Sequence, residues 1–117
     1  KLIMQMRDTI RPTLYTVVET LSFSKQVTNY WTEEEKMAFT FFIANHPTAG
    51  NVIPTTGGLR KIRWSQQGRG KRGGVRVIYY NRLARGEIWL LLIYSKSVGE
   101  NPPAHLLRAL QQEIENA

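Results

Sequence analysis

Residues 75–96 read VRVIYYNRLARGEIWLLLIYSK, and this stretch decides the fold. Two runs rich in Val, Ile, Tyr and Trp, residue types that favour β-strands, flank the short segment 83–86. That spacing predicts a hairpin of two antiparallel strands, 75–82 and 87–96. The second run is apolar throughout at residues 89–93, which predicts a central strand covered on both faces.

The residues before this hairpin are predicted to form a strand, two helices and another strand. Residues 14–21 are rich in Val, Thr and Tyr, as expected of a strand. A short helix should follow, because Phe23, Val27 and Trp31 recur at four-residue spacing.

The second helix is predicted to open at Thr32, since Thr32 and Glu35 have the spacing of a capping box. Pro47 disfavours helical geometry at the residue before it, so this helix should end near Asn45. We expect three apolar residues to form its buried face: Met37, Phe41 and Ala44. A loop is expected at 48–58.

Residues 59–64 alternate, which predicts a strand with Leu59, Lys61 and Arg63 on one face. A last helix should begin with Asn101 as its cap and Pro102 at its first position. Its expected buried side comprises Leu106, Leu107, Leu110 and Ile114. The order β-α-α-β-β-β-α predicts an α+β fold with a small, mainly antiparallel sheet packed by helices. We expect residues 1–12 to be a tail and 13–117 to be one domain.

The charge of the chain is concentrated in its middle. The net charge is +7, and residues 36–86 contain ten Lys and Arg but no Asp or Glu. Such a one-sided positive field attracts a polyanion, and nucleic acid is the leading partner class. A membrane partner is not expected, because the basic residues have strand-like rather than amphipathic-helix spacing. The longest apolar run, residues 88–94, is far short of a membrane span.

Several classes of site are disfavoured by the composition. The chain contains no Cys, which excludes disulfides, thiolate zinc sites and cysteine nucleophiles, and favours a reducing, cytoplasmic compartment. His46 and His105 have no motif partner, so a paired-histidine nuclease is a minor alternative, and no cluster has metal-ligand spacing. We expect neither a metal nor a cofactor.

A glycine motif of the form G-x-G-x-x-G occurs at residues 68–73. A dinucleotide-binding fingerprint would require a helix after it, and here a strand is predicted. The glycines would instead let the backbone approach a phosphate chain while neighbouring cations supply charge. Aromatic residues beside basic ones also suit base stacking, although Tyr79 is more plausibly a core residue. The resulting candidates for RNA binding are Arg60, Arg69, Lys71, Arg72 and Tyr94.

Three pieces of the chain together carry a family resemblance: GGLRKIR at 57–63, GRGKRGGVRVIYY at 68–80 and LLIYSK at 91–96. They strongly resemble toxins of the RelE superfamily, in particular its HigB-like branch, and the similarity runs from about residue 13 onward. The resemblance implies a type II toxin–antitoxin toxin that enters the ribosomal A site and cuts mRNA. It also implies a cognate helix-turn-helix antitoxin that inactivates the toxin. The complex of toxin and antitoxin is then expected to bind its own operator DNA.

The same resemblance implies a set of catalytic residues. Lys61 and Arg63 match two basic positions on the family's catalytic strand, Arg76 matches an arginine that contacts the scissile phosphate, and Lys96 matches a basic residue after the last strand. Ser97 stands where the founding branch has an arginine, and the C-terminal tyrosine of that branch has no counterpart. These cations could support RNA cleavage without a metal. Nearby like charges disfavour a protonated lysine, which makes Lys61 a candidate general base.

Two alternatives remain open from the sequence. One is a non-catalytic toxin of the RelE/ParE fold that acts on a protein target such as DNA gyrase. The other is a plain nucleic-acid-binding module, which would bind without cleaving.

Overall fold

The hairpin at the centre of the chain is present in the computed structural model, which describes residues 15–65, 74–98 and 101–117. Strands β4 (Val75–Arg82) and β5 (Glu87–Ser95) are antiparallel and are joined by a short 3-10 helix, η2 (Leu83–Arg85). Gly86 ends this connection with φ 72°, a left-handed conformation that glycine adopts without strain. The predicted hairpin is confirmed.

The sheet has five strands in the order β1-β5-β4-β3-β2. β1 (Thr16–Glu19) runs parallel to β5, whereas β3 (Arg60–Trp64) and the two-residue β2 (Asn51–Val52) extend the antiparallel part. The predicted α+β class is therefore confirmed. Two details are corrected: β4, not β5, is the middle strand, and part of the loop expected at 48–58 pairs with β3 as β2.

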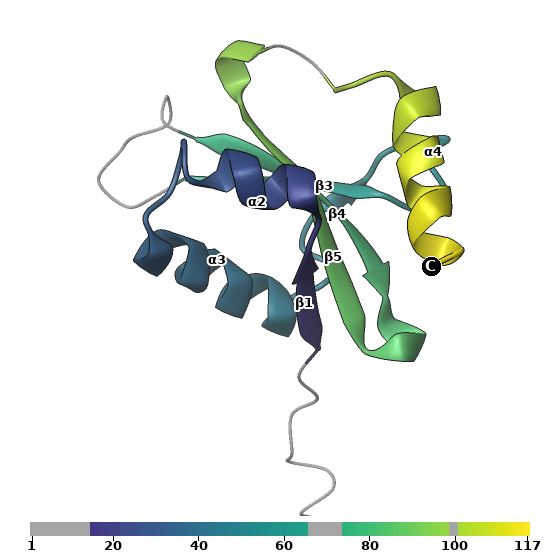
Figure 1. Ribbon diagram of the computed structural model, residues 1–117, viewed down its shortest axis with the longest axis horizontal. Helices are drawn as coiled ribbons and strands as arrows, with labels where there is room; N and C mark the ends of the chain where they lie inside the picture. The colour runs from purple at the N-terminus through teal and green to yellow at the C-terminus, as the bar shows by residue number, and fades with distance from the viewer. Residues whose placement is uncertain (1–14, 66–73, 99–100) are drawn as a thin grey trace, which may run out of the picture.

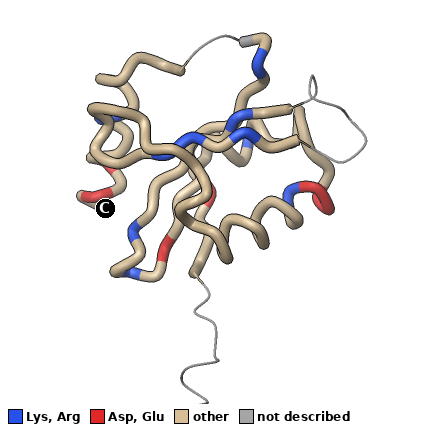
Figure 2. Tube along the Cα trace, turned by 180° about the vertical axis from the view of Figure 1, so that it is seen from behind, with Lys and Arg blue, Asp and Glu red and all other residues tan. Residues whose placement is uncertain are grey.

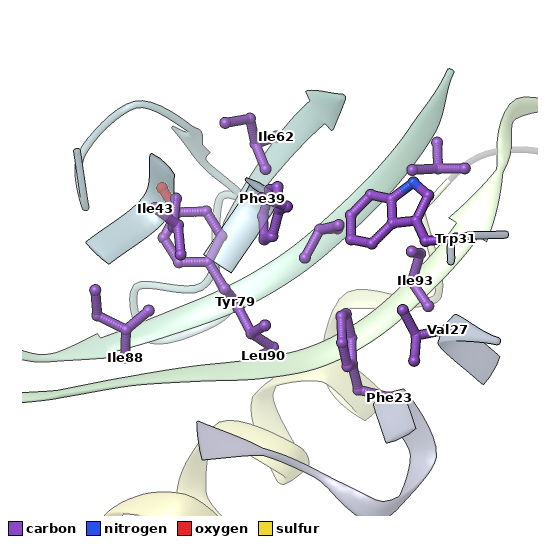
Figure 3. Packing of buried hydrophobic residues seen from close by; sticks show 12 residues of the cluster. Phe23, Val27, Trp31, Phe39, Ile43, Ile62, Tyr79, Ile88, Leu90 and Ile93 are labelled. Carbon is purple, nitrogen blue, oxygen red and sulfur yellow. The ribbon is translucent and has the colours of Figure 1, made fainter. Parts of the chain in front are cut away.

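Helices cover both faces of the sheet (Figure 1). α2 (Leu21–Val27) and α3 (Glu33–Asn45) pack on one face, and α4 (Ala104–Glu115) packs on the other. The core on the α2/α3 face, shown in Figure 3, consists of Phe23, Val27, Trp31, Phe39, Ile43, Ile62, Val75, Val77, Tyr79, Ile88, Leu90 and Ile93. The core on the α4 face consists of Ile53, Leu59, Ile78, Leu91, Leu107 and Ile114. β4 and β5 contribute to both, which confirms the prediction that residues 89–93 are covered on both sides.

α3 begins and ends where the sequence predicts. The backbone N–H of Glu35 donates to Thr32 Oγ1 at 3.1 Å, and the N–H of Thr32 donates to Glu35 Oε1 at 2.9 Å, which completes the capping box. The predicted buried face is wrong, because Met37 is 72% and Phe41 71% exposed while the core takes Phe39 and Ile43 instead.

The physical reason lies in the apolar residues of α3, which occur on both sides of the helix. Residues two apart are separated by about 200° of helix rotation, so Phe39 lies almost opposite Met37 and Phe41. Periodicity alone therefore could not choose the stripe that faces the sheet.

α4 begins later than the sequence predicts. Its N-cap is Pro103, and no side chain caps it, so the expected cap at Asn101 is wrong. Leu107 and Ile114 are buried as predicted, but Leu106 is 52% exposed and Gln111 faces the sheet in its place. Asn101 instead uses its side chain in contacts with the sheet, which are described below.

A β-bulge in β5 determines which residues share a face near the end of that strand. Ile78 pairs with Leu92, but the next residue, Tyr79, pairs with Leu90, so Leu91 is the extra residue. Leu91 and Leu92 both pack on the α4 face. The side-chain alternation is thereby reset, and Tyr94 lies on the α4 face rather than the α2/α3 face.

No helix in the three described ranges is long and apolar enough to cross a membrane. The tail expected at residues 1–12 lies outside those ranges.

Candidate active site

A row of polar side chains crosses three strands on the α4 face of the sheet. Arg63 on β3 pairs with Arg76 on β4, and Arg76 pairs with Tyr94 on β5. Residues that pair directly across antiparallel strands have Cβ atoms about 5 Å apart. Strand alternation accounts for the shared face: Ile62 on β3 and Val75 and Val77 on β4 belong to the opposite core. The predicted alternation of β3 is thus confirmed.

Lys61 joins this row from the same face of β3, two residues before Arg63. Its Nζ donates a hydrogen bond of 2.7 Å to Oδ1 of Asn101, in the segment that leads into α4. The Tyr94 hydroxyl donates to the same oxygen at 3.3 Å. We call Lys61, Arg63, Arg76, Tyr94 and Asn101 the sheet-face cluster.

The cations of the sheet-face cluster are not neutralised by described neighbours. Within the described ranges, the ion pairs involve Lys36 and Arg82, and no carboxylate pairs with Lys61, Arg63 or Arg76. Figure 2 shows several Lys and Arg positions close together in the middle of the chain trace, while other Lys, Arg and Glu positions are spread over the rest of it. Like charges directly opposite each other destabilise a sheet, so an arginine pair without a carboxylate is suited to binding an anion from outside.

Tyr94 is partly buried against the α4-side core. Burial raises its pKa above the ordinary value of 10.0, and the guanidinium of Arg76 offsets this only in part. The hydroxyl therefore stays protonated at neutral pH and can donate a proton or a hydrogen bond.

Lys96 lies just beyond the row. It opens a 3-10 helix, η3 (Lys96–Val98), directly after β5, and it is exposed. Ser95, the residue before it, pairs with Val75 next to Arg76. The sheet therefore brings together three of the four predicted catalytic residues, Lys61, Arg63 and Arg76, and leaves Lys96 at the open end of β5.

The predicted RNA-binding residues separate into three groups. Tyr94 belongs to the sheet-face cluster. Arg60 lies on the opposite face, where its guanidinium donates to the carbonyl oxygens of Gly50 at 2.7 Å and Thr48 at 3.4 Å. The other three, Arg69, Lys71 and Arg72, lie outside the described residues.

Asn101 is the cluster residue that sequence reasoning missed. An asparagine before a proline is typical of a helix cap, so the local pattern pointed to another role. Its contacts with Lys61 and Tyr94 span 40 and 7 residues of sequence. Only a tertiary structure brings these residues together.

The other two strand tyrosines have structural roles. Tyr79 is fully buried, as expected of a core residue; its hydroxyl donates to the Pro47 carbonyl at 2.8 Å and accepts from the Gly50 N–H at 2.9 Å. The Tyr80 hydroxyl contacts Glu115 and accepts from Gln111 at 3.0 Å, which ties α4 to β4.

Over the described ranges, no three His, Asp or Glu side chains come together in a way that could hold a metal ion.

No protein-family model matches the chain. Among solved structures, a double arginine-to-alanine mutant of the E. coli toxin RelE in the free state resembles it with a TM-score of 0.59 and 12% sequence identity. The match covers 84% of this chain and 97% of that one. At this level of identity the likeness concerns the backbone arrangement. The chain therefore has the fold of RelE, with the sheet-face cluster on one side of its sheet.

Proposed function

We propose that this chain is the toxin of a type II toxin–antitoxin system, a metal-independent endoribonuclease that cuts mRNA on the ribosome. The observation that carries the proposal is the pair of Arg63 and Arg76, flanked by Lys61 and Tyr94. Neither arginine forms an ion pair with a carboxylate of the described residues. The RelE fold and the sequence resemblance agree with it.

The reaction that suits this set is attack of an RNA 2′-hydroxyl on the adjacent phosphate. The 2′-oxygen forms a bond to phosphorus, the bond to the 5′-oxygen breaks, and the products are a 2′,3′-cyclic phosphate and a 5′-hydroxyl. The protein has to accept one proton, stabilise the charge on the phosphate and return a proton to the leaving oxygen.

Each cluster residue has a role in this scheme. Arg76 holds two phosphate oxygens with its planar fork, and Arg63 beside it stabilises the negative charge that builds up. Lys61 is the residue that we propose to accept the proton of the 2′-hydroxyl. Tyr94 keeps its proton at neutral pH, so it suits donation to the leaving 5′-oxygen and not the role of base. Lys96 is exposed beyond the row and suits contact with the flanking RNA.

The partners follow from the same proposal. An antitoxin with a helix-turn-helix domain would cover the basic face or block its access to the ribosome, and the complex would bind operator DNA. The activity would reside in residues 13–117 and act in the bacterial cytoplasm. Arg69, Lys71 and Arg72 would add charge contacts to ribosomal or messenger RNA, whereas the described contacts of Arg60 favour a role in holding the segment at 48–50.

The test is to induce the chain in bacterial cells and to map the 5′ ends of mRNA, with and without the product of the neighbouring gene. We expect growth arrest, new 5′-hydroxyl ends within translated mRNA, and reversal of both by the neighbour. Growth arrest with intact mRNA and blocked DNA replication would instead favour a protein target such as gyrase. RNA binding without cleavage or arrest would identify a plain nucleic-acid-binding module.

A further inference from the structure

The Asn101 side chain lies between two groups of the sheet-face cluster that come from different strands. Its Oδ1 accepts from Lys61 Nζ at 2.7 Å and from the Tyr94 hydroxyl at 3.3 Å. An amide oxygen has two lone pairs and can accept both hydrogen bonds at once. Asn101 thereby connects β3, β5 and the segment that leads into α4.

This side chain is not used to start the helix. α4 begins at Ala104 with Pro103 as its N-cap and without a side-chain cap hydrogen bond. Two residues separate Asn101 from Ala104, and its described hydrogen bonds all go to the sheet. The position of Asn101 is therefore explained by its contacts with Lys61 and Tyr94 and not by helix capping.

The charges around Lys61 explain why a neutral acceptor is suited to this place. Arg63 is on the same strand, Arg76 is on β4 and Tyr94 on β5, while the β2 partner of Lys61, Asn51, is uncharged. Repulsion from the two arginines would push the ammonium of a long, flexible lysine away from the row. The amide oxygen holds Lys61 in place without adding a negative charge, which a carboxylate would bring into a site for RNA.

We infer that Asn101 is a positioning residue, which holds the Lys61 amine and the Tyr94 hydroxyl in a common arrangement beside the arginine pair. The inference rests on the proposed ribonuclease function and adds a residue to it. In the reaction, Lys61 and Tyr94 would contact the substrate, and Asn101 would act through them.

The test compares single-turnover cleavage on programmed ribosomes for wild type and Asn101→Leu, which keeps the size of the side chain but removes the acceptor. Misplacement of a reacting group by about 1 Å commonly costs about 100-fold, so we expect the rate to fall by about 10- to 100-fold. Ribosome binding should change by at most about twofold, because no cation is lost. Asn116→Leu, at the exposed end of α4, is the matched control and should retain the wild-type rate.

A double-mutant cycle with Lys61→Met separates positioning from a general structural effect. If Asn101 acts in part through Lys61, Asn101→Leu should slow cleavage less in the Lys61→Met background than in wild type, because one of the two groups that it positions is already missing. Multiplicative losses in the cycle, or an unchanged rate in Asn101→Leu, would overturn the inference.

Failure of the proposed function would look different. If wild type leaves mRNA intact on translating ribosomes, the ribonuclease proposal itself is wrong. The hydrogen bond between Lys61 and Asn101 is then tested by urea unfolding of wild type, the two single variants and the double variant. Coupling between Asn101→Leu and Lys61→Met in the free energy of unfolding would support the contact, and strict additivity would contradict it.

Discussion

Arg63 and Arg76 lie directly opposite each other on neighbouring antiparallel strands, both on the face of the sheet that carries α4. Like charges in cross-strand pairs repel, so this pair costs stability in the free protein. In the proposed reaction, an RNA phosphate would lie between the two guanidinium groups and offset this repulsion.

Replacement of Arg76 should separate its role in function from its role in the fold. Arg76→Ala removes one of the two repelling charges, so we expect a melting temperature equal to or above that of wild type. The cleavage rate on programmed ribosomes should fall by about 100- to 1,000-fold, the usual effect of losing one transition-state stabiliser. Arg76→Lys should recover little, since an ammonium keeps the charge but not the planar fork.

Arg85→Ala, at the exposed β4–β5 connection, is the control with the same loss of charge. Near wild-type cleavage by Arg76→Ala would shift the phosphate-binding role to Arg63 and Lys61.

The segment at 68–73 should contribute to RNA affinity through charge alone. For single strands, log affinity falls with log salt by about 0.7 per phosphate contacted, so replacing Arg69, Lys71 and Arg72 together by Ala should flatten the slope by about two units. Affinity for ribosomes is measured at several salt concentrations. A triple variant with equal loss of charge, Lys25→Ala, Lys36→Ala and Arg85→Ala, should keep the wild-type slope. The same slope in both triple variants would mean that the segment does not contact RNA.

Tyr79→Phe should destabilise the protein in a pH-dependent way. The substitution leaves the buried Gly50 N–H without its acceptor, whereas Pro47 still accepts from Asn81 at 2.9 Å, so we expect a loss of about 1–3 kcal/mol at neutral pH.

The pH dependence follows from the pKa of the Tyr79 hydroxyl. Burial raises this pKa above 10.0, despite the opposing effects of the Gly50 N–H and Arg60. The folded state therefore holds the proton more tightly than the unfolded state. The contribution of the Tyr79 hydroxyl to the free energy of unfolding is complete below about pH 10 and is lost as the pH rises through the raised pKa. Urea unfolding at increasing pH should thus show the difference between wild type and Tyr79→Phe shrinking above about pH 10. A constant difference would contradict this assignment.

Two glycines allow the contact between α4 and the sheet to be tested. Gly57 has φ +81°, and a Cβ there would lie 2.6 Å from Oε1 of Gln111, whereas Gly86 has φ +72° and nothing within 4 Å. Ala at either position should cost about 1–2 kcal/mol for the left-handed backbone. Gly57→Ala should cost about 1 kcal/mol more, because Gln111 has to give up its hydrogen bond to Tyr80. Equal losses of stability in the two variants would show that Gln111 moves aside freely.

Much of the architecture could be predicted from the sequence, because local chemistry specifies it. The capping box at Thr32, the end of α3 before Pro47 and the hairpin closed by Gly86 each depend on residues within a few positions of one another. The alternation along β3 also placed Lys61 and Arg63 on one face. The fold class follows from these elements and their order.

The tertiary structure alone decided three features, each of which depends on contacts between distant residues. Phe39 and not Met37 lies in the core, since α3 is apolar on two sides and only packing against the sheet selects one of them. The tertiary structure placed Asn101 against Lys61 and not at the start of α4. It also inserted the bulge at Leu91, which carries Tyr94 across to the face of Arg76, because a one-residue shift in a strand exchanges its two faces. The sequence by itself thus determined the strands and their cations, whereas strand pairing and packing determined which of these side chains meet.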